Sequence, residues 1–375
     1  MLAGVLVLLL SCCAAPAEGA DVSRARATIT AIAPAQPGAD PADGQVDQIV
    51  TVRLLEGPYA GRELGVIHRR MKHSVRDFDL RVGQRVVVSL SADGVGRLTA
   101  YSLIISRTDY LSILTVIFVI ATLLFGRAKG LASLLALILS GVIVIKILIP
   151  AILRGYNPIG ASVGAAALIT GVSFLLISGF TRKTAAAVLG TIGGAVTAGL
   201  LARYFVEIVA ITGTAADDVG TLITELGATI NYQGLFMAGI LIGTLGVVMD
   251  VAMSISAVVF ELKATSPGIS LGGLIGSGLT VGRDVMATMV NTLILAYAGT
   301  SIPLFLIFHY SDLGYRYALN SETVAGEIIR ALCGSVGLIL TIPLTAAFAA
   351  FLAGSRERRR QQRARGRRST GGRRG

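Results

Sequence analysis

Long apolar runs dominate the chain from residue 110 onward and predict membrane-spanning helices. A helix needs roughly 20 residues to cross the hydrocarbon core. The predicted spans are residues 110–126, 130–153, 158–180, 184–211, 234–261, 283–299 and 330–352. Two shorter apolar segments, 269–281 and 301–310, are expected to be re-entrant or interfacial, unless 301–310 continues the sixth span through a kink at Pro303. We expect seven transmembrane helices, give or take one.

Residues 24–107 show a different pattern, in which apolar and polar positions alternate over short stretches. Five such stretches occur, at residues 27–32, 48–55, 63–68, 85–90 and 97–105. Turn-forming segments separate them. This spacing predicts a small β-barrel of the OB type, which closes on itself and so leaves no exposed sheet edge. No aromatic residues interleave with the basic run that starts at residue 69, so we expect no nucleic acid to bind.

The first 20 residues resemble a secretory signal. Residues 2–10 are apolar and residues 14–17 are small or proline, but no positive charge precedes the apolar run. We therefore leave open whether residues 1–20 are cleaved, are lipidated at Cys12, or stay as an anchor. In each case the β domain that follows is expected outside the cytoplasm.

Composition and charge sharpen this picture. The chain is 53% hydrophobic and only 15% charged, which excludes a soluble or a disordered protein as a whole. Of the net charge of +11, residues 355–375 carry +9 through ten arginines and one glutamate. We expect this segment to be a disordered cytoplasmic tail that contacts anionic lipid rather than nucleic acid.

The loop charges indicate one orientation. With seven spans crossed in order, the basic loops at 127–129, 182–183 and 263 fall on the same side as the arginine-rich tail. Basic loops face the cytoplasm. The transmembrane domain, residues 110–352, is therefore expected to have a cytoplasmic C-terminus, with the β domain on the opposite side.

The fifth predicted span carries the most informative polar pattern. Gly239, Gly243, Gly246, Asp250, Ser254 and Ala257 recur every three or four residues and so lie on one helix face. Glycines allow close helix packing in lipid. Asp250 is near the bilayer centre, where a carboxylate costs about 2.5–3.5 kcal/mol on insertion scales.

The sixth predicted span brings further polar residues to a similar depth. We expect Asp250, Thr288 and Asn291 to line an intramembrane site for an ion or small solute. Its cytoplasmic mouth would be formed by Glu261, Arg283 and Asp284. The alternative is a hydrogen-bonded staple that only fixes helix packing.

Motifs for other chemistry are missing from the sequence. There is no phosphate-binding loop, Cys-x-x-Cys pair, nucleophile elbow or zinc-ligand spacing. Methionine pairs at 249/253 and 286/289 would suit Cu(I), yet they are typical core fillers. We expect no enzymatic activity, no catalytic residue, no cofactor and no metal.

The segments Gly246–Ser254 and Gly282–Gly299, with the preceding β domain, resemble the YibE/F-like family of bacterial membrane proteins. The resemblance extends over about residues 24–352. It implies a multi-pass protein of the bacterial cell membrane with an extracytoplasmic N-terminal part, and it implies no reaction.

Two functions follow as expectations. The first is a transporter or channel that uses the site around Asp250, where the carboxylate carries a proton or cation. The second is a membrane scaffold whose β domain recruits an extracytoplasmic protein. A homo-oligomer is compatible with either.

Overall fold

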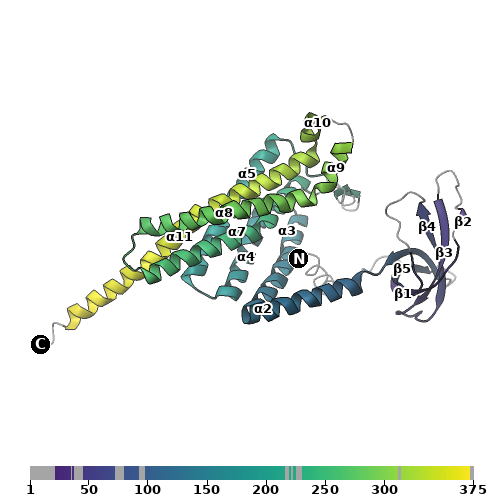
Figure 1. Cartoon of the computed structure of the whole chain (residues 1–375), viewed down its shortest axis with the longest axis horizontal. Coiled ribbons are helices and arrows are strands. Elements are labelled where there is room, and N and C mark those ends of the chain that lie inside the picture. Colours follow the sequence, from purple (N-terminus) through teal and green to yellow (C-terminus); the bar gives the residue numbers. More distant parts are fainter. Residues whose placement is uncertain are drawn as a thin grey trace. The chain divides into compact units, whose positions relative to one another are not determined.

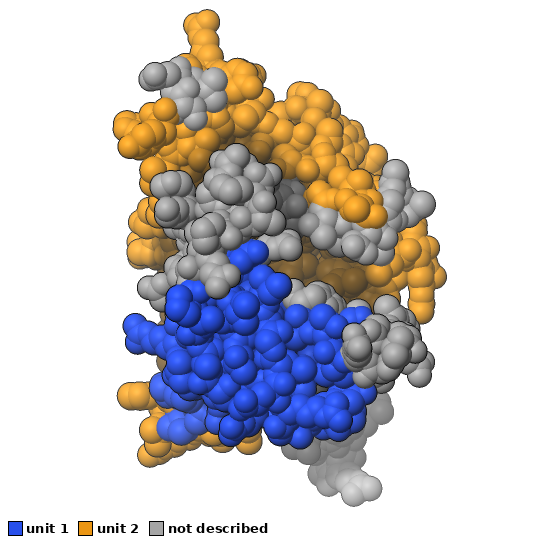
Figure 2. All heavy atoms as spheres, turned by 90° about the vertical axis from the view of Figure 1, so that its right-hand side faces the viewer, with its two compact units in different colours: residues 1–120 blue, residues 121–375 orange. Residues whose placement is uncertain are grey.

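The chain forms two compact units, residues 1–120 and 121–375 (Figure 2). The computed structural model describes residues 22–34, 36–37, 45–71, 80–92, 98–215, 219–220, 223–224, 230–310 and 314–371. The expected signal or anchor at residues 1–20 lies outside these. Figure 1 shows a small β domain and a bundle of long helices.

The first unit contains a small five-stranded β-barrel, as the sequence predicted. Its strands are β1 (Val22–Ile32), β3 (Gln45–Leu54), β4 (Glu63–Met71), β5 (Arg85–Ala92) and β6 (Leu98–Ile105). They pair in the order β1-β5-β6-β4-β3, and β3 pairs back with β1 to close the barrel. A two-residue strand, β2 (Gln36–Pro37), pairs antiparallel with one end of β3. Alternating side chains such as Ile29, Val50, Val66 and Val88 fill the interior.

One seam of the barrel is weaker than the others. All neighbouring strands are antiparallel except β4 and β6, which run parallel and are joined at a single register pair, Val66 with Ala100. By contrast, β3 and β4 pair over nine residues.

The second unit holds most of the apolar helices. Among the described residues, six helical stretches are long and apolar enough to cross a membrane. These are Thr108–Leu153 (α2, Thr108–Ile143; η2, Val144–Leu148; α3, Ile149–Leu153), α4 (Pro158–Ser178), α5 (Arg182–Ile208), α7 (Tyr232–Thr265), α8 (Leu271–Thr300) and the first part, to Gly354, of α11 (Glu322–Gly371). The protein is thus a multi-pass membrane protein.

The first of these stretches is broken at Arg127. This residue has φ 47° and ψ −128°, a conformation outside the helical region. A Cβ on Gly130 would overlap the carbonyl oxygen of Thr122, which lies eight residues earlier. Residues this far apart are about 12 Å apart along a straight helix, so the chain folds back sharply at Arg127.

Two sequence predictions need correction in the later helices. The short segment 269–281 is not a separate re-entrant piece, because α8 runs unbroken from Leu271 to Thr300. Helix α8 ends at Thr300, with Ser301 as its C-cap. The residues that follow form a separate short helix, α9 (Ile302–Tyr310), which has Pro303 in its first turn. A Pro is tolerated there, because the first amides of a helix have no intrahelical acceptor. A further short helix, α10 (Tyr315–Asn320), precedes α11.

Helix α11 is the centre of the bundle. It packs against α5, α7 and α8. The closest approaches occur at glycines: a Cβ on Gly194 would overlap the Thr341 hydroxyl, and one on Gly334 would overlap Thr244. Small residues thus allow these backbones to meet, as expected for helices packing in lipid.

The same helix extends into the arginine-rich segment. The backbone of α11 is helical to Gly371, whereas the sequence predicted a disordered tail from residue 355. Arginine and alanine are good helix formers, and a helix that is already nucleated can be extended at little cost.

Candidate functional site

Helix α7 exposes a single stripe to the outside of the bundle. It begins after Asn231, whose side-chain oxygen accepts a hydrogen bond from the Gly234 amide at 2.8 Å. From there to Glu261 most residues are buried or half-buried against α4, α5, α8 and α11. The exposed ones, which we call the α7 stripe, are Gly239, Gly243, Gly246, Asp250, Ser254 and Glu261. None of them carries an apolar side chain: three are glycines, and the others are Asp250, Ser254 and Glu261.

Asp250 lies in the middle of the α7 stripe. Within the described chain its carboxylate has no hydrogen bond or ion pair, and only its backbone carbonyl is engaged, by the Ser254 hydroxyl at 2.8 Å. A staple that fixed packing inside one chain would need such a partner. In a single chain, Asp250 therefore lies on an open polar surface and does not fix the packing of two helices.

The glycines of the α7 stripe differ from those that pack the bundle. Nothing lies within 4 Å of a Cβ placed on Gly239 or Gly246, whereas one on Gly243 would lie 2.9 Å from the Tyr297 hydroxyl of α8. Within one chain, close contacts are made instead at Gly190, Gly194, Gly282 and Gly334. The packing role predicted for Gly239 and Gly246 has no partner helix among the described residues.

Thr288 lies level with Asp250 and Asn291 lies within one helical turn of that depth, but both face another way. Gly243 faces Tyr297, Ile255 faces Gly282 and Val259 faces Gly278, so α7 and α8 run antiparallel and side by side. Interpolating between these pairs places Asp250 at the depth of Thr288, and Asn291 about two residues, ~3 Å, from the depth of both Gly246 and Asp250.

The two helices turn these residues onto different surfaces. Helix α8 packs through Gly278, Gly282, Met286 and Leu293. Asp284, Thr288 and Asn291 are exposed and lie on the opposite side, which we call the outer face of α8. The structure therefore brings the three site residues to within about one helical turn of each other in depth without joining their side chains.

The residues expected at the cytoplasmic mouth are all exposed. Glu261 is at the end of the α7 stripe, and Arg283 and Asp284 are in the first half of α8. No ion pair links them among the described residues. The structure places them toward the end of the bundle where Arg182 begins α5 and donates a hydrogen bond to the Leu352 carbonyl.

At the other end of the bundle, Glu322 holds the loop that follows α5. Its Oε1 accepts hydrogen bonds from the amides of Thr212 (2.7 Å) and Gly213 (2.9 Å), and from the Thr212 hydroxyl (2.8 Å). Gly213 has φ 77°, and a Cβ there would lie 2.5 Å from the Tyr232 carbonyl oxygen. Only glycine fits this turn without strain.

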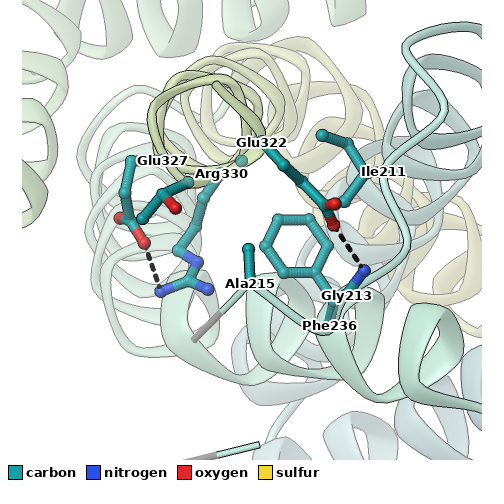
Figure 3. Close-up of a pocket in the computed structure, with 9 residues that line it drawn as sticks. Ile211, Gly213, Ala215, Phe236, Glu322, Glu327 and Arg330 are labelled. Atoms are coloured by element: carbon teal, nitrogen blue, oxygen red, sulfur yellow. Dashed lines mark hydrogen bonds and ion pairs between the residues drawn. The ribbon is translucent and has the colours of Figure 1, made fainter. Parts of the chain in front are cut away.

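A cavity of about 50 Å³ lies beneath this loop (Figure 3). Glu327 and Arg330 of α11 line it and form an ion pair at 3.1 Å. The Arg330 guanidinium carbon stands 5.1 Å from the centre of the Phe236 ring, which is a cation–π distance. Gly334 of α11 faces Leu293 of α8, so Tyr297 stands near the level of Arg330, and its hydroxyl faces Gly243 of the α7 stripe.

Three buried polar atoms in this cluster lack a hydrogen-bond partner within the described chain. They are Glu327 Oε2, Arg330 Nε and the Tyr297 hydroxyl. Such atoms are usually satisfied by water or a ligand. The cluster thus connects a small polar cavity at the Glu322 end with the Gly243 level of the α7 stripe.

The sequence interpretation missed this cluster. Its signal was the opposite charges of Glu327 and Arg330, three residues apart at the start of an apolar run. The approach of Tyr297 and Phe236 from other helices had no such signal, because it depends on how α7 and α8 pack on α11. No three His, Cys, Asp or Glu side chains gather as a metal site in the described part of the chain.

The match to a known family covers the helical part of the chain. No curated protein and no solved structure matches it. The family model for YibE/F-like proteins matches residues 114–355, which include α7, α8 and the spanning part of α11 but not the β domain. Since this range is more than half of the chain, the protein belongs to the YibE/F-like family.

Proposed function

We propose that this YibE/F-like protein is a transporter or channel for a small ion or solute, and that the α7 stripe lines its path. One observation carries the proposal: the exposed residues of α7 from Tyr232 to Glu261 are only glycine, serine and carboxylate. Hydrocarbon is a poor solvent for such a surface, and ionisable groups inside membrane helices mark ion or substrate pathways.

Polar groups at three levels support a continuous path. The Glu327–Arg330 pair and Tyr297 lie at one end, Asp250 in the middle, and Glu261 at the other end of the α7 stripe. Because the Asp250 carboxylate has no protein partner within the described chain, it is free to bind a proton or cation. We assign it the role of carrier.

We also propose seven membrane crossings. A straight helix of the 46 residues from Thr108 to Leu153 would be about 69 Å long, more than twice the roughly 30 Å of the hydrocarbon core. The break at Arg127 divides it into two lengths that each suit one crossing.

Seven crossings place the arginine-rich end of α11 and the β domain on opposite sides of the membrane. The positive-inside rule then makes the arginine-rich end cytoplasmic. The protein would lie in the bacterial inner membrane with its barrel outside. The closed five-stranded barrel supports an OB-type assignment.

Flux measurements with purified protein in proteoliposomes test the transport role. Vesicles are given a proton, Na⁺ or K⁺ gradient, and each is loaded with a dye that responds to the ion of that gradient. We expect the wild-type protein to dissipate at least one of these gradients. Asp250→Asn should slow this dissipation by about tenfold or more, equivalent to ~1.4 kcal/mol in the barrier.

The matched control is Glu207→Gln, which neutralises an exposed carboxylate on α5 that pairs only with Arg203. It should retain wild-type flux. Equal rates for wild-type protein and Asp250→Asn would overturn the role of Asp250. If gradients of protons, Na⁺, K⁺ and small metabolites all persist as in empty vesicles, the transport proposal is wrong.

A second candidate function is a scaffold, and the barrel seam favours it. A groove of about 540 Å³ is lined by Gly65, Ile67, His68, Thr99, Ala100, Ser102 and Leu103. It lies where β4 and β6 share a single pair, and Ile67 is 56% exposed there. Such a surface suits an extracytoplasmic protein partner.

A photo-cross-linker tests the scaffold in the full-length protein in cells. Placed at Ile67, it should trap a second protein. Placed at Val82, which is 63% exposed in a turn of the same barrel, it should not. Equal trapping at both positions, or at neither, would contradict partner binding at the seam.

A further inference from the structure

Two polar surfaces of the bundle are unpartnered at the same depth. The first is the α7 stripe, with open space at Gly246 and an unpaired carboxylate at Asp250. The second is the outer face of α8, with Thr288 and Asn291. In the described chain no helix covers either surface.

Lipid is a poor cover for the outer face of α8. Only 11% of the membrane-length window of α8 is buried, against 50% for α5 and for α7. Among the six candidate spans α8 is also the least apolar. Its exposed polar residues include Thr280, Arg283, Asp284, Thr288, Asn291 and Thr292.

The first apolar stretch shows what a lipid-facing surface of this chain looks like. Thr108–Leu153 is also mostly exposed, with 17% of its window buried, but it is the most apolar of the six. Its exposed residues include Leu124, Phe125 and Leu131. An exposed apolar helix is therefore ordinary in this bundle, because lipid can cover it. An exposed polar helix such as α8 is better covered by protein.

We propose that a second copy of this chain covers both surfaces, with the outer face of α8 in each copy packed against the α7 stripe of the other. Two copies inserted with the same topology are related by a two-fold axis along the membrane normal. Every residue then meets residues of its own depth. Asp250 comes opposite the partner's Thr288, and Gly246 comes within about two residues, ~3 Å, of the depth of the partner's Asn291.

The two surfaces are chemically complementary. The Asp250 carboxylate accepts hydrogen bonds, and the Thr288 hydroxyl and the Asn291 amide can donate them. Arg283, about one and a half helical turns from the depth of Asp250, adds a positive charge on the same helix.

The shapes are complementary as well. The α7 stripe offers glycines with nothing within 4 Å at 239 and 246, so a neighbouring helix can approach its backbone closely. The outer face of α8 offers the larger side chains Thr288 and Asn291. A symmetric dimer buries both surfaces twice, once for each copy.

This assembly would complete the candidate site with residues from both copies. The proposal rests on the two exposed surfaces and not on the transport function, so that it holds whether or not the site moves a solute. Cross-linking and flux measurements can therefore fail independently.

Cysteine cross-linking between two differently tagged full-length copies tests the interface. Both copies carry Cys12→Ala, Cys13→Ala and Cys333→Ser. One copy adds Gly246→Cys and the other Asn291→Cys, and the two are co-expressed and oxidised in native membranes. We expect a disulfide-linked heterodimer carrying both tags.

The matched control replaces Gly246→Cys with Val196→Cys. Val196 is an exposed residue of α5 (36%). The contacts of Gly199 with Leu241 and of Lys183 with Ser256 place it at nearly the depth of Gly246. We expect no heterodimer from this pair.

The mass of the wild-type protein in lipid nanodiscs, measured by native mass spectrometry, provides a second readout that needs no substitution. A dimer together with the Gly246–Asn291 cross-link supports the proposal. A monomer would overturn it. So would a dimer that cross-links equally at Val196 or not at all at Gly246.

Discussion

Glu322 accepts a hydrogen bond from the backbone amide of Gly213 at 2.9 Å, although 109 residues separate the two in the chain. The bond joins the start of α11 to the loop after α5, above the cavity that Arg330 lines. It therefore closes one end of the bundle at the place where the polar cluster begins.

Gly213 should not tolerate a side chain. Its φ of 77° strains any residue other than glycine, and a Cβ would lie 2.5 Å from the Tyr232 carbonyl oxygen. We expect Gly213→Ala to lower the free energy of unfolding by about 1–3 kcal/mol. SDS-induced unfolding in mixed micelles measures this. Gly155 has a similar φ of 82° but open space around its Cβ position. Gly155→Ala therefore introduces the backbone strain without the clash, and it should lower the free energy of unfolding by less than Gly213→Ala. Equal losses would mean that the Tyr232 contact does not matter.

For the stability of the fold, the negative charge of Glu322 should matter less than the position of its side-chain oxygen. Glu322→Ala removes the acceptor for two backbone amides and should destabilise the fold by about 1–3 kcal/mol. Glu322→Gln keeps a side-chain oxygen in place and should cost less. The same unfolding measurement compares the two variants, and a greater loss for Gln than for Ala would contradict the geometry.

The glycines of the bundle should divide into two classes. A Cβ on Gly194 would overlap the Thr341 hydroxyl, so Gly194→Ala overpacks the α5–α11 contact and should cost about 1–3 kcal/mol. Gly246→Ala meets open space within one chain and should leave the monomer as stable as wild type or slightly more stable. Unfolding at a protein concentration low enough to dissociate oligomers makes the comparison. The assignment of Gly194 fails if both variants unfold alike.

The coupling energy between Glu327 and Arg330 should be larger than that of an ordinary surface ion pair. Its side chains are 25% and 30% exposed, against 59% for both members of the Arg203–Glu207 pair. Exposed pairs contribute about 0.2–1 kcal/mol, whereas hydrogen bonds between charged groups with less solvent reach about 1.5–3 kcal/mol. Double-mutant cycles with Glu→Gln and Arg→Gln measure both couplings. A larger coupling at Arg203–Glu207 would contradict this prediction.

Arg127 is expected to be strained. Its φ of 47° and ψ of −128° lie in a region that glycine enters freely and other residues avoid. Arg127→Gly should therefore raise the free energy of unfolding by about 1 kcal/mol. Lys129→Gly, in the helical part of the same turn region, should instead lower it by a similar amount. Stabilisation by both substitutions, or by neither, would contradict the strain assigned to Arg127.

The sequence by itself determined the elements. Alternation gave the five barrel strands, because a half-buried strand has a period of two residues. Apolar length gave the spanning helices, because the hydrocarbon core sets the number of residues needed. The spacing of Gly239, Gly243, Gly246 and Asp250 placed them correctly on one helix face. Depth was also within reach, because the rise per residue is fixed: Asn291 was expected at about the depth of Asp250 and lies about two residues, ~3 Å, from it.

Only the tertiary structure decided which faces meet. Periodicity places Thr288 and Asn291 on one side of α8, but it cannot say that Gly278 and Gly282 turn the opposite side toward α11. The identity of the packing glycines, the approach of Tyr297 to Gly243 and the cluster at Arg330 likewise depend on helices far apart in sequence. In lipid, helix packing follows close shape fit rather than hydrophobicity, and shape fit is a property of two surfaces that no single helix pattern contains.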